Sequence, residues 1–154
     1  EALTHVQIAY SDLIPDLHAL PSAYKQTALA LRVGKLFYSE QSVFPFNKLG
    51  IGRLIHELPE KLCEDFLFEI FGGITSEHLD KDTLAAIDKF FQNNLNIAET
   101  ARQLHMHRNT LIYRLEQVEK RTGLDLRQFE DAMTFKIAIM ILNYLQSERN
   151  VSHE

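Results

Sequence analysis

Apolar residues recur every three or four positions through the second half of the chain, which is the spacing of helices with one buried face. This pattern predicts helices over residues 80–92, 97–104, 108–122 and 129–145. Asn96 is a suitable N-cap for the second helix, and Glu99, three residues later, completes a pair that resembles a capping box. Gly123 directly follows the third helix, where glycine commonly ends a helix. The second half is therefore expected to be helical throughout.

The third predicted helix has an apolar stripe and a polar face. At about 100° per residue, Leu111, Leu115 and Val118 share one side, which is expected to be buried. The opposite side holds side chains that can hydrogen-bond base edges or phosphates: Asn109, Tyr113, Gln117 and Lys120, with Thr110 and Arg114 at its flanks. A short helix, a tight connection and a second helix with a polar outer face are typical of a helix-turn-helix that binds the major groove of DNA.

The connection between these two helices contains two histidines. Many helix-turn-helix motifs have glycine where this chain has His105, and histidine tolerates a left-handed backbone better than most residues. His107 precedes the third helix and is expected either to cap it or to donate to a phosphate. Both histidines could bind a metal together with Cys63, but no third ligand lies at a recognisable spacing, so neither a metal nor another cofactor is expected.

The last predicted helix, over residues 129–145, is apolar on all sides between Ile137 and Leu142. It is either the central helix of a small domain or also a subunit interface. The residues after Gln146 form a polar tail that is expected to fray.

The first half of the chain has a mixed pattern. An edge strand is expected over residues 6–10, followed by a loop, a helix that begins at Pro21 and is closed by Gly34, and one or two short strands within residues 35–46, the second weakened by Pro45. A short helix within residues 47–58 and a helix over residues 59–71 come next. The inward face of that last helix is expected to consist of Leu62, Phe66, Leu67 and Ile70.

Gly72-Gly73 is the clearest break in the pattern, and the domain boundary is expected near residues 72–77. The sequence therefore predicts a mainly α chain with three parts. These are a partial α+β module at residues 1–74, a helical helix-turn-helix domain at residues 78–147 and a polar tail at residues 148–154.

The net charge of −5 disagrees with nucleic-acid binding, for which a basic footprint is expected. Between residues 101 and 121, however, five cations and two anions give a local net charge of +3. The cations are Arg102, Arg108, Arg114, Lys120 and Arg121, and the anions are Glu116 and Glu119. A compact basic patch on an acidic protein can still bind phosphates, and His105 and His107 are possible further donors.

The remaining composition bears on the compartment. The one cysteine, Cys63, cannot form an internal disulfide or a multi-thiolate metal site, which fits a reducing cytoplasm. The longest strictly apolar run, residues 137–142, is too short to span a bilayer, so no membrane partner is expected. The first residues are expected to lie inside a domain, and the chain is expected to be a fragment of a longer protein.

The run from His107 to Leu111, the sequence Tyr113-Arg114-Leu115 and the pair Thr122-Gly123 follow the order found in one protein family. With NIAETARQLHM before them and the helix at 129–145 after them, they resemble the C-terminal DNA-binding domain of PucR/CdaR-type bacterial transcription regulators. The resemblance covers roughly residues 79–145. It implies a Fis-like helix-turn-helix, homo-oligomerisation and a small-molecule effector sensed outside this fragment.

Upstream, AYKQTALALRVG and LGIGRLIHELP resemble the end of the degenerate GGDEF-like domain found in these regulators. This second resemblance implies no cyclase activity, and the chain has no intact GGDEF signature.

The expected function is sequence-specific binding of double-stranded DNA by a transcription regulator that acts as a homodimer or higher oligomer. Asn109, Tyr113 and Gln117 are expected at base edges and Arg108, Thr110 and Arg114 mostly on phosphates, and His107 and Lys120 complete the predicted contact set. The alternative is a non-enzymatic dimerisation module with a vestigial helix-turn-helix. An enzyme descended from a nucleotide cyclase is a third hypothesis, but no metal-binding carboxylate pair or complete phosphate loop supports it.

Overall fold

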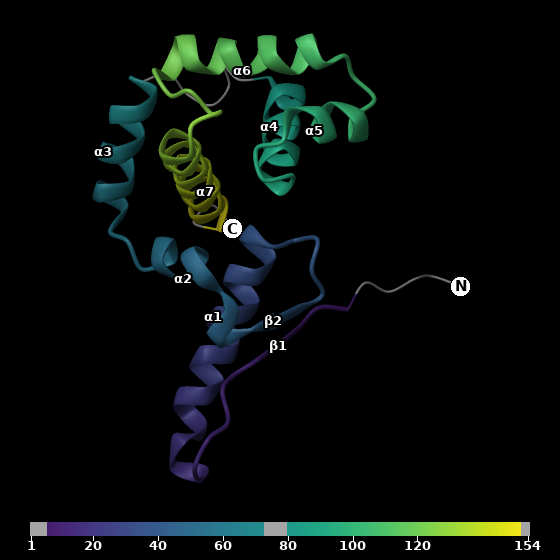
Figure 1. Cartoon of the computed structure of the whole chain (residues 1–154). Helices are drawn as coiled ribbons and strands as arrows, with labels where there is room; N and C mark the ends of the chain where they lie inside the picture. The colour runs from purple at the N-terminus through teal and green to yellow at the C-terminus, as the bar shows by residue number, and fades with distance from the viewer. Residues whose placement is uncertain (1–5, 73–79, 152–154) are drawn as a thin grey trace. The chain divides into compact units, whose positions relative to one another are not determined.

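The computed structural model describes residues 6–72 and 80–151, which are mainly helical as predicted (Figure 1). The chain divides into two compact units. The first unit comprises Glu1–Glu60 with Asn143–Glu154, and the second comprises Lys61–Leu142. Within the described ranges, no helix is both long enough and apolar enough to cross a membrane.

The first unit is built on two short parallel strands and the helix that connects them. Strand β1 (Ile8–Tyr10) pairs with β2 (Val43–Pro45), with Ile8 opposite Val43 and Tyr10 opposite Pro45. The predicted edge strand is thus confirmed. Helix α1 (Leu20–Phe37) contacts both strands and is preceded by the 3-10 turn η1 (Leu17–Ala19). The turn η2 (Phe46–Lys48) and helix α2 (Gly50–His56) follow β2.

Gly34 does not close α1, so the prediction of its C-terminus was wrong. The helix continues through Gly34 to Phe37, and a single strand, β2, occupies the segment where one or two were expected. The reason is packing: a Cβ atom at position 34 would overlap the ring of Phe44, which is only 1% exposed. Glycine is needed here to let a strand residue pack directly on the helix backbone, and not to end the helix.

The second unit contains five helices in its described part: α3 (Glu60–Phe71), α4 (Lys81–Gln92), α5 (Ile97–Gln103), α6 (Arg108–Thr122) and α7 (Phe129–Val151), of which α7 continues into the first unit. The helices share one apolar core. Its buried members are Phe71, Ala86, Ile87, Phe90, Ala101, Leu111, Leu115, Val118, Leu126, Phe135 and Ala138.

The inward face of α3 differs from the prediction by part of a turn. Phe66, Leu67 and Ile70 pack against the core as expected, but Leu62 is 53% exposed. Cys63 is fully buried in its place, and Phe71 is buried at the other end. Because a cysteine thiol behaves as a small hydrophobe, the buried face is centred one residue further along, and Leu62 falls outside it.

Helix α7 ends later than the sequence predicted. Helix α7 runs to Val151, so residues 148–151 of the predicted frayed tail are helical. Two features explain why the helix continues. No glycine or proline follows Gly123 to end it, and Glu148 forms an ion pair with Arg32, both within the first unit. The predicted domain boundary lies mostly at residues 73–79, outside the described residues, and the domain limits of 1–74 and 78–147 stay predictions.

Candidate nucleic-acid interface

Helices α5 and α6 and the turn between them form the predicted helix-turn-helix (Figure 1). Asn96 caps α5: its side-chain oxygen accepts a hydrogen bond of 3.0 Å from the backbone N–H of Glu99. His105 lies in the turn with φ of 51°, a left-handed backbone that histidine tolerates better than most residues. The Met106 N–H donates to the Ala101 carbonyl at 3.0 Å and closes the turn against α5.

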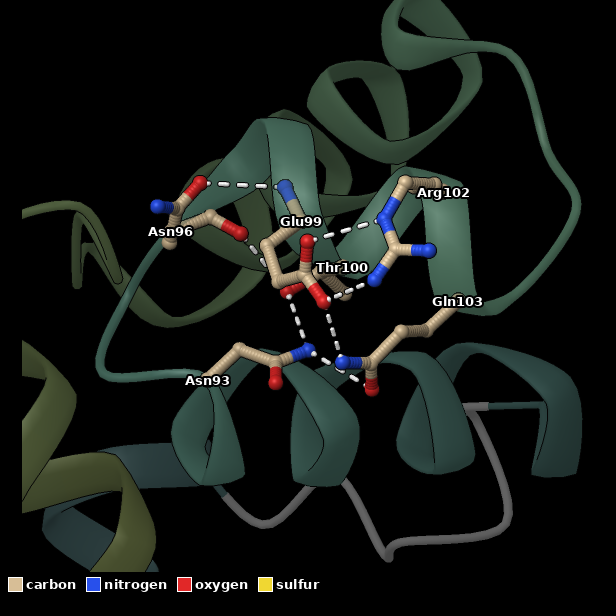
Figure 2. A network of polar contacts seen from close by, with 6 residues as sticks. All are labelled: Asn93, Asn96, Glu99, Thr100, Arg102 and Gln103. Carbon is tan, nitrogen blue, oxygen red and sulfur yellow. Dashed lines mark hydrogen bonds and ion pairs between the residues drawn. The ribbon is translucent and has the colours of Figure 1, made fainter.

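The capping box is only half formed, because Glu99 does not return a bond to Asn96. Its carboxylate accepts hydrogen bonds from Arg102, at 2.9 and 2.5 Å, and from Gln103, at 2.5 Å (Figure 2). The Asn96 N–H donates instead to the Asn93 carbonyl at 3.0 Å. Arg102 and Gln103, three and four residues after Glu99 on the same helix, therefore bind the carboxylate that a complete capping box would direct to the Asn96 N–H.

The same network joins the end of α4 to α5. The side-chain amide of Asn93 donates to the Thr100 hydroxyl at 3.2 Å and to the Gln103 side chain at 3.3 Å (Figure 2). Thr100 is fully buried and donates its hydroxyl to the Asn96 carbonyl at 2.7 Å. Because the buried Thr100 hydroxyl both donates and accepts within this network, its burial leaves no unsatisfied hydrogen-bonding group, and the network holds the short helix α5 against the end of α4.

This network makes a prediction about pH. The hydrogen bonds from Arg102 and then Gln103 lower the pKa of Glu99 from its ordinary 4.5 to about 2. A lowered pKa stabilises the folded chain above pH 4.5, and this contribution is lost as the pH falls through about 2. A carbon-13 NMR titration of the Glu99 carboxyl should give a midpoint near 2. In Arg102→Ala the midpoint should rise towards the ordinary value, and an ordinary midpoint in the unmodified chain would contradict the network.

Helix α6 is capped at both ends by the residues predicted for these roles. The Nδ1 atom of His107 accepts from the Asn109 N–H at 3.3 Å, and Gly123 has φ of 75° at the C-terminus. The side chains predicted to form the core, Leu111, Leu115 and Val118, are each at most 1% exposed. The side of α6 that packs on the domain is therefore the predicted one.

The polar face of α6 is exposed. Tyr113 is 60% exposed, Gln117 is partly buried, and five other predicted contact residues are exposed: His107, Arg108, Asn109, Thr110 and Lys120. None of the described residues forms an ion pair with Arg108 or Lys120 within 4 Å. Both charges at the ends of this face are therefore available to a polyanion.

Two other cations of the predicted basic patch are bound within the domain. Arg102 pairs with Glu99 as described above. Arg114 donates from Nη1 to the backbone carbonyl of Asp82 at 2.8 Å, in the first turn of α4. Arg114 therefore differs from the other predicted phosphate contacts, Arg108 and Thr110, which are exposed.

Arg127, which was not among the predicted contact residues, bridges two carboxylates next to α6. Its guanidinium lies 2.9 Å from Glu119 and 2.6 Å from Asp125. Arg127 offsets the negative charge of Glu119 in the second half of α6, and so reduces repulsion of a phosphate there. Asp125, two residues before Arg127, was the available sequence signal. In the described part of the chain, no group of three or more His, Cys, Asp or Glu side chains is arranged to hold a metal ion.

Residues 83–141 match the family model described as the PucR C-terminal helix-turn-helix domain. The purine catabolism regulatory protein of Bacillus subtilis is 27% identical over 135 residues, which cover 87% of this chain and 25% of that protein. The uncharacterized protein YsfB of Bacillus subtilis is 37% identical over 125 residues, or 81% of this chain and 32% of that protein. The carbohydrate diacid regulator of Escherichia coli is 41% identical over 59 residues, or 38% and 14%.

The chain thus spans at most about a third of the length of these relatives. The match of 135 residues is longer than the helix-turn-helix region at 83–141. The upstream part of the chain therefore also has a counterpart in at least one of these relatives.

Proposed function

Because residues 83–141 match the family model described as the PucR C-terminal helix-turn-helix domain, we propose that this chain is the DNA-binding part of a bacterial transcription regulator. This is the class of function predicted from the sequence, and relatives named as regulators agree with it. The observation that carries the proposal is the division of α6 into a fully buried stripe and an exposed polar face, near whose two ends Arg108 and Lys120 form no ion pair with any described residue.

The exposed face divides into groups suited to bases and groups suited to phosphates. Asn109 and Gln117 carry amides that can bind adenine in a bidentate way, and Tyr113 lies between them on the same face. Arg108 and Thr110 are at the start of the helix, where the backbone N–H groups also favour a phosphate. His107 and Lys120 complete the proposed contact set at the two ends.

The length of α6 suits this assignment. Arg108 and Lys120 are twelve residues apart, which is about 18 Å along a helix axis at about 1.5 Å per residue. The two cations therefore flank, along the helix, the residues proposed to contact base edges, from Asn109 to Gln117.

The other proposals concern the whole regulator. Two copies of the chain would present two copies of α6, about 34 Å apart or a multiple of it, to read successive major-groove faces. The effector would bind outside this chain, in a cytoplasmic protein without enzymatic activity. Residues 1–74 would be the end of a degenerate GGDEF-like domain.

The proposal is tested by selecting bound duplexes from genomic DNA and measuring their affinity by fluorescence anisotropy at several salt concentrations. Arg108→Ala combined with Lys120→Ala should lower affinity and reduce the slope of log K against log salt by about 1.8, since each lost phosphate contact removes about 0.9. A matched control, Lys25→Ala combined with Lys35→Ala, removes two exposed cations from α1 and should leave the slope unchanged.

Two results would contradict the proposal. Equal losses in the two double variants would show that binding depends only on overall charge. An intact oligomer with no affinity for any duplex at low salt would favour the alternative, a dimerisation module with a vestigial helix-turn-helix.

A further inference from the structure

Arg114 is held against a neighbouring helix, although it lies on the helix proposed to read DNA. Its Nη1 atom donates to the backbone carbonyl of Asp82 at 2.8 Å, across 32 positions of sequence. The side chain is partly buried, whereas Arg108 and Lys120 on the same helix are exposed. Arg114 follows Tyr113 by one residue, so it lies about 100° around the helix from the centre of the exposed face.

The surroundings of this contact suit a cation that stays in place. Asp80 caps α4 by accepting from the Thr83 N–H at 2.8 Å, and Asp82 lies in the first turn. The pKa of Asp80 is lowered first by the side-chain hydrogen bond from Thr83, and the charge of Arg114 is a smaller cause in the same direction. The negative charge of Asp80, which interacts with that of Arg114, offsets the unfavourable interaction between a cation and a helix N-terminus.

Apolar packing alone does not fix the rotation of α6 about its axis. Leu111, Leu115 and Val118 bury an apolar stripe, and hydrophobic contacts do not depend strongly on direction. A hydrogen bond, in contrast, weakens steeply with misalignment. With a helix radius of about 5–6 Å including side chains, a rotation of about 10° moves side-chain ends by about 1 Å. That displacement exceeds the distance range within which a side chain and a base edge hydrogen-bond well.

We propose that Arg114 is a positioning residue: its hydrogen bond to the Asp82 carbonyl sets the rotation of α6, so that the exposed face meets base edges in register, and Arg114 itself binds no phosphate. This inference rests on the proposed DNA-binding function. It assigns to Arg114 a contribution to sequence discrimination, and leaves Arg108 and Lys120 as phosphate contacts.

The test compares Arg114→Ala with Arg108→Ala on a duplex selected by the unmodified chain and on an unrelated duplex, over a range of salt concentrations. Arg114→Ala should lower affinity for the selected duplex on the order of tenfold, the scale of one misplaced base contact, with little change on the unrelated duplex. Its salt slope should stay that of the unmodified chain. Arg108→Ala should weaken binding to both duplexes alike and reduce the slope by about 0.9.

Other outcomes overturn the inference separately from the function. A uniform loss on both duplexes, with a slope reduced by about 0.9, would make Arg114 a phosphate contact. Unchanged affinity and discrimination would show that the Asp82 contact positions nothing. Failure of the unmodified chain to bind any duplex would remove the proposed function itself. Circular dichroism at the assay temperature checks folding, and if Arg114→Ala does not fold, Arg114→Met, which keeps an aliphatic stem but cannot donate to the Asp82 carbonyl, should give the same two readouts.

Discussion

Replacing Leu115 with alanine should destabilise the second unit by about 2–5 kcal/mol. Leu115 is 1% exposed and belongs to the buried cluster that α6 shares with the other helices of its unit. The loss combines the transfer free energy of the removed methyl groups with the cavity that they leave. Since domains are commonly stable by only about 5–15 kcal/mol, this one change removes a large share of the folding free energy.

The effect should be local and should depend on burial. Urea unfolding followed by circular dichroism gives the total change, and amide hydrogen exchange shows which unit opens more readily. Leu62→Ala is the matched control, because it makes the same substitution on a helix of the same unit at a side chain that is 53% exposed. It should change stability by no more than about 0.5 kcal/mol. Equal effects of the two substitutions would contradict the burial of the stripe on α6.

The features of the helix-turn-helix that were predicted correctly are local in sequence. Asn96, His107 and Gly123 act on backbone groups within four residues of themselves, so their roles follow from short-range helix rules. The buried stripe of α6 follows in the same way from the period of the helix. His105 is an exception: glycine is usual at this position of the turn, and the structure shows that histidine adopts the left-handed backbone there.

The features that were missed depend on competition or on distant contacts. Glu99 had two possible sets of partners, and the sequence pattern did not show that Arg102 and Gln103 would take its carboxylate. The contact of Arg114 with the Asp82 carbonyl was also missed, because nothing nearby in the sequence indicates that acceptor. Single-sequence rules describe what a residue can do on its own helix, and tertiary packing decides which of those options it takes.

Gly34 is another residue whose role was set by a tertiary contact, and it leads to the second large expected effect. Gly34→Ala should destabilise the first unit by about 2 kcal/mol or more. Alanine is the better helix former, by about 1 kcal/mol, so propensity alone predicts the opposite sign. The new Cβ atom would, however, overlap the Phe44 ring, which belongs to the paired strand β2 and is not the end of a flexible side chain. The steric cost therefore exceeds the gain in propensity.

A double-mutant cycle measured by urea unfolding separates these two contributions. Once Phe44→Ala has removed the ring, Gly34→Ala should become neutral or stabilising, because only the helix-propensity gain remains. Gly123→Ala provides a contrasting control: nothing lies within 4 Å of its added Cβ atom, so its cost comes from the backbone φ of +75° alone and should be about 1 kcal/mol. That cost should be the same with or without the Phe44 ring. If Gly34→Ala were equally damaging in both backgrounds, the close approach of β2 to α1 would be wrong, and helix termination at Gly34 would again be the better interpretation.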